Sequence, residues 1–187
     1  MCFSGIGQIV FGIIMIACFV LTCASMFSDN WRTFKNNAED TIKSGIFSFN
    51  CHIPGSNGAA QSCDSSEWWN SLKTWEKVTV VAMCLAVATE LLCLAWNLFA
   101  CFACCCKKYV IHPLTLFATL VAIFLAVGVI VYGVNNKDAL DNVNFNNGEW
   151  KKTEVGYSFY LAVVALVLAV VDIFVAGLTV CLAEKCC

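Results

Sequence analysis

Apolar residues in this chain are gathered into four long runs, and polar segments separate them. The runs cover residues 6–27, 78–102, 114–132 and 158–182. A helix needs about 20 residues to cross the hydrocarbon of a bilayer, which is about 30 Å thick, and each run is close to or above that length. The pattern predicts four transmembrane helices joined by loops at about 28–77, 103–113 and 133–156.

Composition supports a membrane protein rather than a soluble one. Of the 187 residues 60% are hydrophobic and only 13% are charged, which is too few charges to cover a water-soluble globule. A secretory signal begins with basic residues, and its apolar part has about 7–15 residues. The first run has no basic residue before it and is longer than that apolar part, so we predict a retained helix. The segments between the runs leave no room for a soluble catalytic domain. We therefore expect a single domain over 1–187 that is not an enzyme.

Charges and span number together predict the orientation. An even number of spans places both ends of the chain on one side. The short loop at 103–113 carries Lys107 and Lys108 without an acid, and Lys185 lies in the tail, as is typical of cytoplasmic segments. The loops on the other side hold slightly more acidic than basic residues. We expect a multi-pass plasma-membrane protein with both termini in the cytoplasm.

The cysteines strengthen this orientation. Only two of the 14, Cys51 and Cys63, lie in the long loop, and none lies in 133–156. A turn sequence, Pro-Gly-Ser-Asn-Gly at 54–58, separates them. A single pair in an aqueous loop predicts one disulfide in an oxidising compartment, so this loop is expected to be extracellular or lumenal.

The long loop also carries strand signals. Residues 45–51 include Ile46, Phe47 and Phe49, which favour a strand, and the turn to Cys63 predicts a hairpin. Because two strands alone are marginal in water, we expect further strands from 31–43 and from the second loop. The tryptophans of this loop, Trp31, Trp68, Trp69 and Trp75, are read as aromatic anchors at the membrane interface in preference to ligand-stacking groups.

Small residues recur along three of the runs, and in the third and fourth runs they are spaced three and four residues apart. The fourth run carries Ala162, Ala165, Ala169, Asp172, Ala176 and Thr179, the third carries Ala118, Ala122 and Ala126, and the first carries Gly5, Gly7, Gly12, Ala17 and Ala24. Stripes of this kind let helices approach closely in lipid. They predict a left-handed four-helix bundle. Together with the strands expected in the loops, this gives an all-α membrane protein with a small β-sheet outside the bilayer.

Two acids, Glu90 and Asp172, lie near the middle of their runs. Acids at this depth are costly when charged and are often functional, for example in proton relays and transporters. However, none of the runs contains Lys, Arg or His. We therefore favour neutral packing groups, either protonated or hydrogen-bonded to Asn97, Thr89 or a backbone carbonyl.

Cysteines are dense where the second and fourth runs end: Cys101, Cys104, Cys105, Cys106, Cys181, Cys186 and Cys187. Thiols at the membrane surface beside basic residues predict S-palmitoylation, with plain buried thiols as the alternative. A zinc site is disfavoured because the run lacks paired Cys-x-x-Cys spacing. No phosphate-binding loop or other cofactor motif occurs, so we expect no cofactor, no metal and no nucleic-acid partner.

The order Trp31, Gly45-Ile46-Phe47, Cys51 and Cys63 resembles the loop signature of the claudin, peripheral-myelin-protein and AMPA-receptor regulatory-protein superfamily. The sequence Gly-Tyr-Ser-Phe-Tyr at 156–160 is similar to the entry of the fourth helix in the same proteins. Phe47 stands where claudins have tryptophan, and three residues rather than two separate it from Cys51. The chain thus resembles a divergent member, of the invertebrate (nematode) claudin-like branch.

The resemblance implies a four-helix bundle capped by an antiparallel sheet, with four strands from the first loop and one from the second. Trp31, Gly45, Ile46, Phe47, Cys51 and Cys63 would form that cap. It implies a role in cell junctions, adhesion and the paracellular barrier, through contacts with lipid and with copies in cis and trans. The alternative is an auxiliary subunit of an ion channel or receptor. The tail is unlike a PDZ-binding end, so scaffold binding is not expected.

Overall fold

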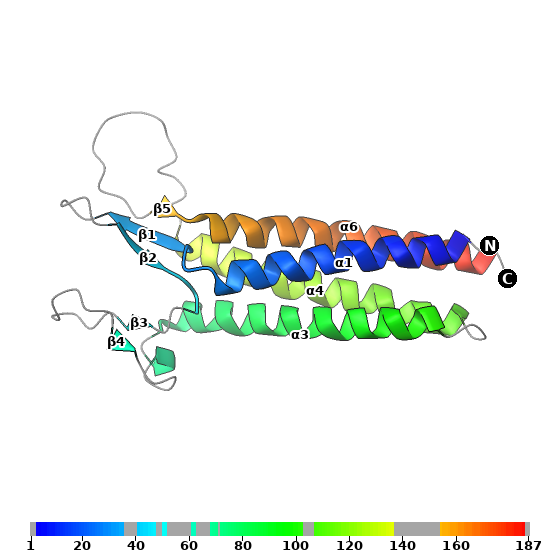
Figure 1. Cartoon of the computed structure of the whole chain (residues 1–187), viewed down its shortest axis with the longest axis horizontal. Helices are drawn as coiled ribbons and strands as arrows, with labels where there is room; N and C mark the ends of the chain where they lie inside the picture. The colour runs from blue at the N-terminus through cyan, green and yellow to red at the C-terminus, as the bar shows by residue number, and fades with distance from the viewer. Residues whose placement is uncertain are drawn as a thin grey trace, which may run out of the picture.

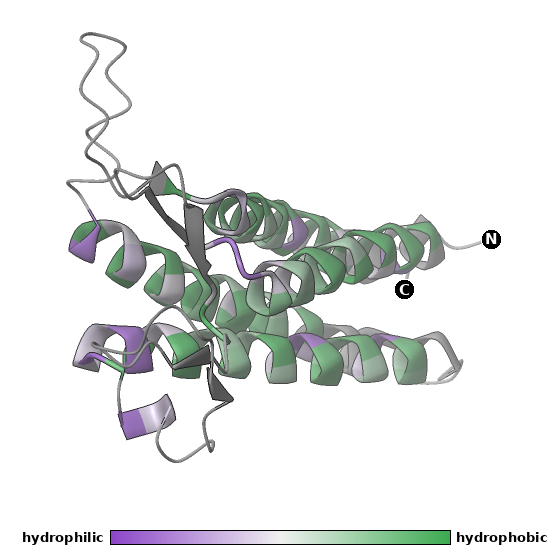
Figure 2. Cartoon of the chain, turned by 60° about the vertical axis from the view of Figure 1, so that its left-hand side comes forward, coloured by the Kyte–Doolittle hydropathy of each residue, from purple (hydrophilic) through white to green (hydrophobic). Residues whose placement is uncertain are grey.

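A computed structural model of the chain describes residues 3–35, 41–47, 50–51, 61–62, 68–70, 72–102, 107–136 and 154–185. Four long helices dominate it: α1 (Phe3–Phe27), α3 (Thr74–Phe102), α4 (Lys107–Asn135) and α6 (Tyr157–Lys185). Each contains a window long and apolar enough to cross a bilayer. Hydrophobic residues cover all four helices along their length (Figure 2). The prediction of a four-span helical membrane protein is confirmed.

The helices form one elongated bundle with two different ends (Figure 1). Both chain termini lie at one end, which we call the terminal end, and all strands lie at the other, which we call the strand end. Around the bundle α1 packs against α6 and α3, and α4 packs against α3 and α6, so the four helices close a ring. The left-handed supercoil of the bundle stays a prediction.

Helix α4 is longer than its apolar run. It begins at Lys107 and continues through Pro113, so the predicted loop at 103–113 was wrong for residues 107–113. Inside a helix, proline lacks the N–H bond to the preceding turn and its ring crowds the carbonyl four residues earlier. Helices of membrane proteins nevertheless tolerate proline, because neighbouring groups satisfy the freed main-chain atoms. Hydropathy marks where a helix enters lipid rather than where it begins.

Short strands follow α1 and precede α6. They are β1 (Arg32–Lys35), β2 (Thr41–Ser44), β3 (Asn50–Cys51), β4 (Gln61–Ser62) and β5 (Glu154–Val155). Antiparallel pairing joins β2, β1 and β5 in one sheet, with Arg32 opposite both Ser44 and Val155, and joins β3 to β4 in a second. The family-type cap formed by a single sheet stays a prediction.

The predicted strand over 45–51 was wrong for its first three residues. Gly45, Ile46 and Phe47 form a turn between β2 and β3. Ile46 is buried against the bundle, and Phe47 stacks on Trp68 with ring centroids 5.6 Å apart. Packing onto the helix ends therefore overrides the strand propensity of these residues.

The alanine stripes face inward, as predicted for packing surfaces. On α6 the side chains of Ala162, Ala165, Ala169 and Ala176 are buried, and on α4 those of Ala118 and Ala122 are buried. On α1 only the glycines follow the prediction: Gly7 faces Thr179 and Gly12 faces Asn97, whereas Ala17 and Ala24 are exposed. Small residues thus mark helix contacts on α4 and α6 but not reliably on α1.

Candidate site at the strand end and in the bundle interior

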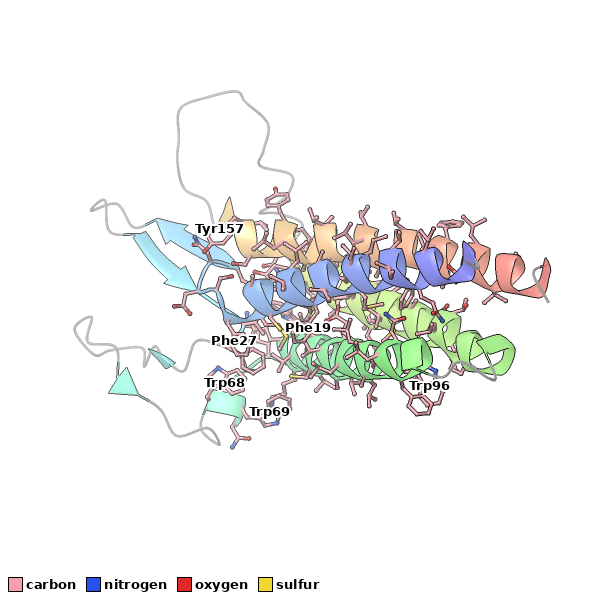
Figure 3. The ribbon with its side chains drawn as sticks, turned by 45° about the vertical axis from the view of Figure 1, so that its right-hand side comes forward. Phe19, Phe27, Trp68, Trp69, Trp96 and Tyr157 are labelled. Atoms are coloured by element: carbon pink, nitrogen blue, oxygen red, sulfur yellow. The ribbon has the colours of Figure 1, made fainter. Side chains whose placement is uncertain are left out.

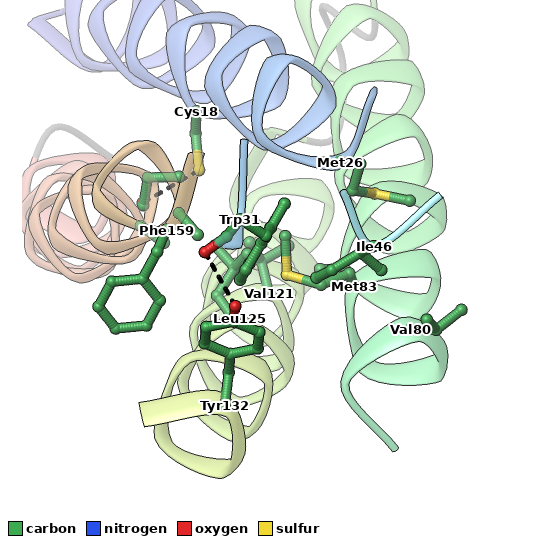
Figure 4. Close-up of a cluster of buried hydrophobic side chains, with 14 of the residues drawn as sticks. Cys18, Met26, Trp31, Ile46, Val80, Met83, Val121, Leu125, Tyr132 and Phe159 are labelled. Atoms are coloured by element: carbon green, nitrogen blue, oxygen red, sulfur yellow. Dashed lines mark hydrogen bonds between the residues drawn. The ribbon is translucent and has the colours of Figure 1, made fainter. Parts of the chain in front are cut away.

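Trp31 is the centre of the strand end. The sequence predicts that Trp31 is an interfacial anchor. However, the Trp31 side chain is only 1% exposed and packs between the helices at the strand end of the bundle (Figure 4). Its ring meets Tyr132 edge-on with centroids 4.7 Å apart and Phe159 at 6.2 Å. Its indole Nε1 donates to the carbonyl of Ser25 at 2.6 Å, which also satisfies a carbonyl of the last turn of α1.

The main chain of Trp31 connects three distant segments. Its carbonyl accepts a bond from the Tyr132 hydroxyl of α4 at 2.9 Å and another from the Gly156 N–H, just before α6, at 3.0 Å. Beside it, the N–H of Ser158 donates to the carbonyl of Asn30 at 3.3 Å. The start of the first loop is therefore fixed to the end of α4 and to the start of α6. We call Trp31, Tyr132, Phe159 and Gly156 the Trp31 cluster.

Two glycines allow this close approach. A Cβ at Gly156 would overlap the carbonyl of Asn30. A Cβ at Gly45 would lie 2.9 Å from both Asp29 Cα and Ser28 O, which is closer than real contacts of this kind. Main-chain atoms cannot move away as a flexible side chain can, so both positions require glycine. This gives a physical reason for the motif glycine at 45.

Aromatic side chains continue from the Trp31 cluster across the strand end. Phe27, Phe47, Trp68 and Trp69 follow one another with centroids 5.6–6.2 Å apart. Trp68 is buried, while Trp69 is 37% exposed and lies 5.7 Å from Lys77 Nζ. Figure 3 shows Trp96 at the opposite end of the bundle. Trp69 and Trp96 thus suit interfacial positions, whereas Trp68 is a packing residue.

Glu90 lies inside the bundle and is fully buried. Its Oε1 accepts bonds from the Thr22 hydroxyl at 2.9 Å and the Cys18 thiol at 3.2 Å, both on α1. The expected partners were wrong: Thr89 donates to Leu85 of its own helix, and the amide of Asn97 reaches the carbonyl of Gln8 at 3.4 Å. Glu90 therefore joins α3 to α1.

Asp172 is also fully buried, on the inward stripe of α6, as predicted. Unlike Glu90, neither of its carboxyl oxygens has a hydrogen-bond partner among the described residues. The same is true of Gln8 Nε2 and Asn97 Oδ1. We call Gln8, Asn97 and Asp172 the inner polar site, because all three face the interior in the half of the bundle that includes the terminal end.

Several predicted residues cannot be placed. The side chains of Cys51, Cys101, Cys104, Cys105 and Cys106 are outside the described part of the structure, as are Cys63, Cys186 and Cys187. The disulfide and most acylation sites therefore stay predictions. Cys181 is described and is exposed near the end of α6. Among the described residues no three His, Cys, Asp or Glu side chains are grouped so that they could hold a metal ion.

Sequence reasoning missed the residues that complete both regions. Cys18 and Thr22 lie four apart on α1 and could have been proposed as donors to an acid on a neighbouring helix. The sequence marks Tyr132 only as the last residue of the third run. Gln8 carried no signal beyond being a polar residue within an apolar run, which in a membrane is itself informative.

A comparison with known families decides the relationship of the chain. The family model described as "Tight junction protein, Claudin-like" matches residues 1–187, the full length. The chain belongs to the claudin-like family. A search of curated proteins gave no match. The claudin-like protein is thus a four-span protein of a non-enzymatic membrane family whose members contact lipid and other membrane proteins.

Proposed function

We propose that this claudin-like protein acts at cell–cell junctions of the plasma membrane through contacts made by its strand end. The strand end would face the extracellular side, with both termini in the cytoplasm. The observation that supports this most is that the Trp31 carbonyl accepts two hydrogen bonds, one from Tyr132 and one from Gly156, which fix the start of the first loop to both ends of the second loop. Two loops held together in this way can present one surface to copies on the same and the opposing cell.

Expression in cells that lack junction strands tests the proposal. The protein should concentrate where two expressing cells touch, form strands in freeze-fracture images and raise the electrical resistance of the cell layer. Gly156→Ala should abolish these effects because the extra methyl displaces the main chain of Asn30. Gly177→Ala is the matched control, since nothing lies within 4 Å of the added Cβ.

The alternative function, an auxiliary subunit of a channel or receptor, would appear in the same cells. A channel that purifies with the protein in a fixed ratio, without enrichment at cell contacts, would contradict the junction proposal. Docking against another protein's helices would use small-residue faces that point out of the bundle. Those of α4 and α6 are mostly buried in the bundle, so they do not support it.

Orientation and cross-linking have their own tests. A tag at residue 1 should be reached by antibody only in permeabilised cells, and a tag within 137–153 also in intact cells.

Cys51→Ser and Cys63→Ser should lower surface expression equally because each removes the same disulfide. Cys84→Ser, at an exposed free thiol of α3, is the control. Normal trafficking of either loop variant would refute the pairing.

Acylation at the terminal end is the last part of the proposal. The exposed thiol of Cys181 and the cysteines at 101–106 and 186–187 would carry palmitoyl groups next to Lys107, Lys108 and Lys185. Hydroxylamine-sensitive acyl exchange should give a signal that falls when these cysteines are replaced by serine. Absence of a signal in the wild-type protein would remove this part.

A further inference from the structure

The bundle interior contains polar atoms that the protein leaves unpaired. Among the described residues these buried atoms are Gln8 Nε2, Glu90 Oε2, Asn97 Oδ1 and both carboxyl oxygens of Asp172. They come from three helices, α1, α3 and α6. A buried polar group without a partner costs on the order of 1–3 kcal/mol, and in lipid no outside solvent reduces that cost. A set of such atoms in one region indicates that something other than the described side chains satisfies them.

The packing of α1 provides room for this set. A Cβ at Gly12 would lie 2.6 Å from Asn97 Nδ2, and a Cβ at Gly7 would collide with the Thr179 side chain. Glycine thus occurs on α1 where polar side chains of α3 and α6 cross the interior. Larger residues at both positions would push these polar groups aside.

Asp172 lies at the level of Asn97 along the bundle axis. On α6 it is midway between Thr179, which faces Gly7 of α1, and Ala165, whose carbonyl accepts from the Cys18 thiol of α1. Asp172 is therefore level with the middle of that stretch of α1, where Gly12 faces Asn97. The Asn97 amide in turn donates to the main-chain carbonyl of Gln8 at 3.4 Å. Unpaired polar groups that lie at one level without touching are groups that a bridging water can join.

The balance of donors and acceptors defines what can occupy the region. With Asp172 ionised, three of the four unpaired atoms of the inner polar site are acceptors and only Gln8 Nε2 is a donor. The buried side chains that pack together in this part of the bundle, Phe11, Met15, Cys93, Leu114, Ala118 and Ala176, include no cationic group, and the Cys93 thiol is the one among them that titrates. No Lys, Arg or His lies in any apolar run.

Protonation removes this imbalance. A neutral Asp172 supplies one O–H donor and keeps one acceptor, which together with the amides gives the two to four partners that an internal water needs. We propose that Asp172 is held as a neutral carboxylic acid and is linked through internal water to the side-chain amides of Asn97 and Gln8. The inner polar site is then a binding site for a proton and water.

Infrared spectroscopy of the protein in phosphatidylcholine vesicles tests this, with ¹³C-labelled aspartate for assignment. Asp172 is the only aspartate inside an apolar run, so a neutral-acid C=O band that moves on labelling reports it without any substitution. At neutral pH we expect this band at the frequency of a hydrogen-bonded acid, with a rapid shift in D₂O. Asn97→Leu and Gln8→Leu should each move it toward the frequency of a free acid.

Three further variants complete the test. Gly12→Ala should move the band in the same direction because it displaces the Asn97 amide, while Glu90→Gln should leave the aspartate band unchanged. Asp172→Asn should abolish it. The proposal would be overturned by a missing neutral-acid band, by a free-acid band that Asn97→Leu does not move, by exchange in D₂O that takes hours, or by a carboxylate band that responds to Na⁺.

Discussion

The Trp31 cluster and the inner polar site both contain buried polar groups, but they satisfy them differently. Around Trp31 the partners are main-chain groups and the distances are 2.6–3.3 Å. Among the described residues, the one hydrogen bond between members of the inner polar site is the 3.4 Å bond from the Asn97 amide to the main-chain carbonyl of Gln8, and the two Asp172 oxygens have no partner. Main-chain partners make the strand end a fixed structure. Side-chain amides and an acid leave the interior adjustable.

A substitution should lower the stability of the protein most where the main-chain atoms of two segments touch each other. Gly156→Ala is expected to destabilise the protein by about 3 kcal/mol or more, because the added Cβ meets the Asn30 carbonyl and the Gly156 N–H would be moved from Trp31. Thermal unfolding in mild detergent measures this. Gly177→Ala should be neutral or slightly stabilising, since alanine is the better helix former. Equal effects at the two glycines would break the comparison.

Trp31→Phe should have the second largest effect. The smaller ring leaves a gap beside Tyr132 and Phe159, and the Ser25 carbonyl loses its indole donor. We expect a loss of about 2–4 kcal/mol, measured by the same unfolding assay. Phe99→Leu, at an exposed ring facing lipid, is the control and should change little. A mild effect at Trp31 would mean that the strand end is as adjustable as the interior.

Tyr132→Phe sharpens the comparison by removing a single bond. The ring stays against Trp31 and Trp75, and the Trp31 carbonyl keeps its bond from Gly156. The free energy of unfolding should fall by about 1 kcal/mol, which is typical for the loss of one buried hydrogen bond whose acceptor retains another partner. Combining it with Trp31→Phe should give less than the sum because the two residues touch.

Glu90→Gln should have the smallest effect, below about 1 kcal/mol. The amide oxygen can still accept from Thr22 and Cys18, and no charge is placed in the interior. Unfolding temperature and surface expression should both be close to wild type, whereas Glu90→Leu should lose some stability because Thr22 and Cys18 keep only their main-chain acceptors, the carbonyls of Cys18 and Ala165. A strong functional defect in a folded Glu90→Gln protein would assign Glu90 a role beyond packing.

The sequence predicted the features that depend on local pattern and missed those that depend on distant contacts. Four apolar runs predict four helices, and the spacing of Asp172 with alanines predicts its inward position. By contrast, nothing near Trp31 indicates that Tyr132 and Gly156 both bond to its carbonyl. The turn at Gly45–Phe47 was missed because the propensity of Ile46 and Phe47 is decided by the surface against which they pack. The partners of Glu90 were missed because they lie on another helix.

The bonds at the Trp31 carbonyl also set the order in which the protein can be completed during synthesis. Tyr132 lies 101 residues after Trp31, and Gly156 lies 125 residues after it. While the ribosome is still making the later helices, the first loop has neither donor and the Trp31 ring has no aromatic neighbours from α4 and α6. Contacts of such sequence separation form late, and the intermediate exposes groups that chaperones and degradation machinery recognise. The residue that holds the mature strand end together therefore stays without these partners in the nascent chain until the start of α6 has been made.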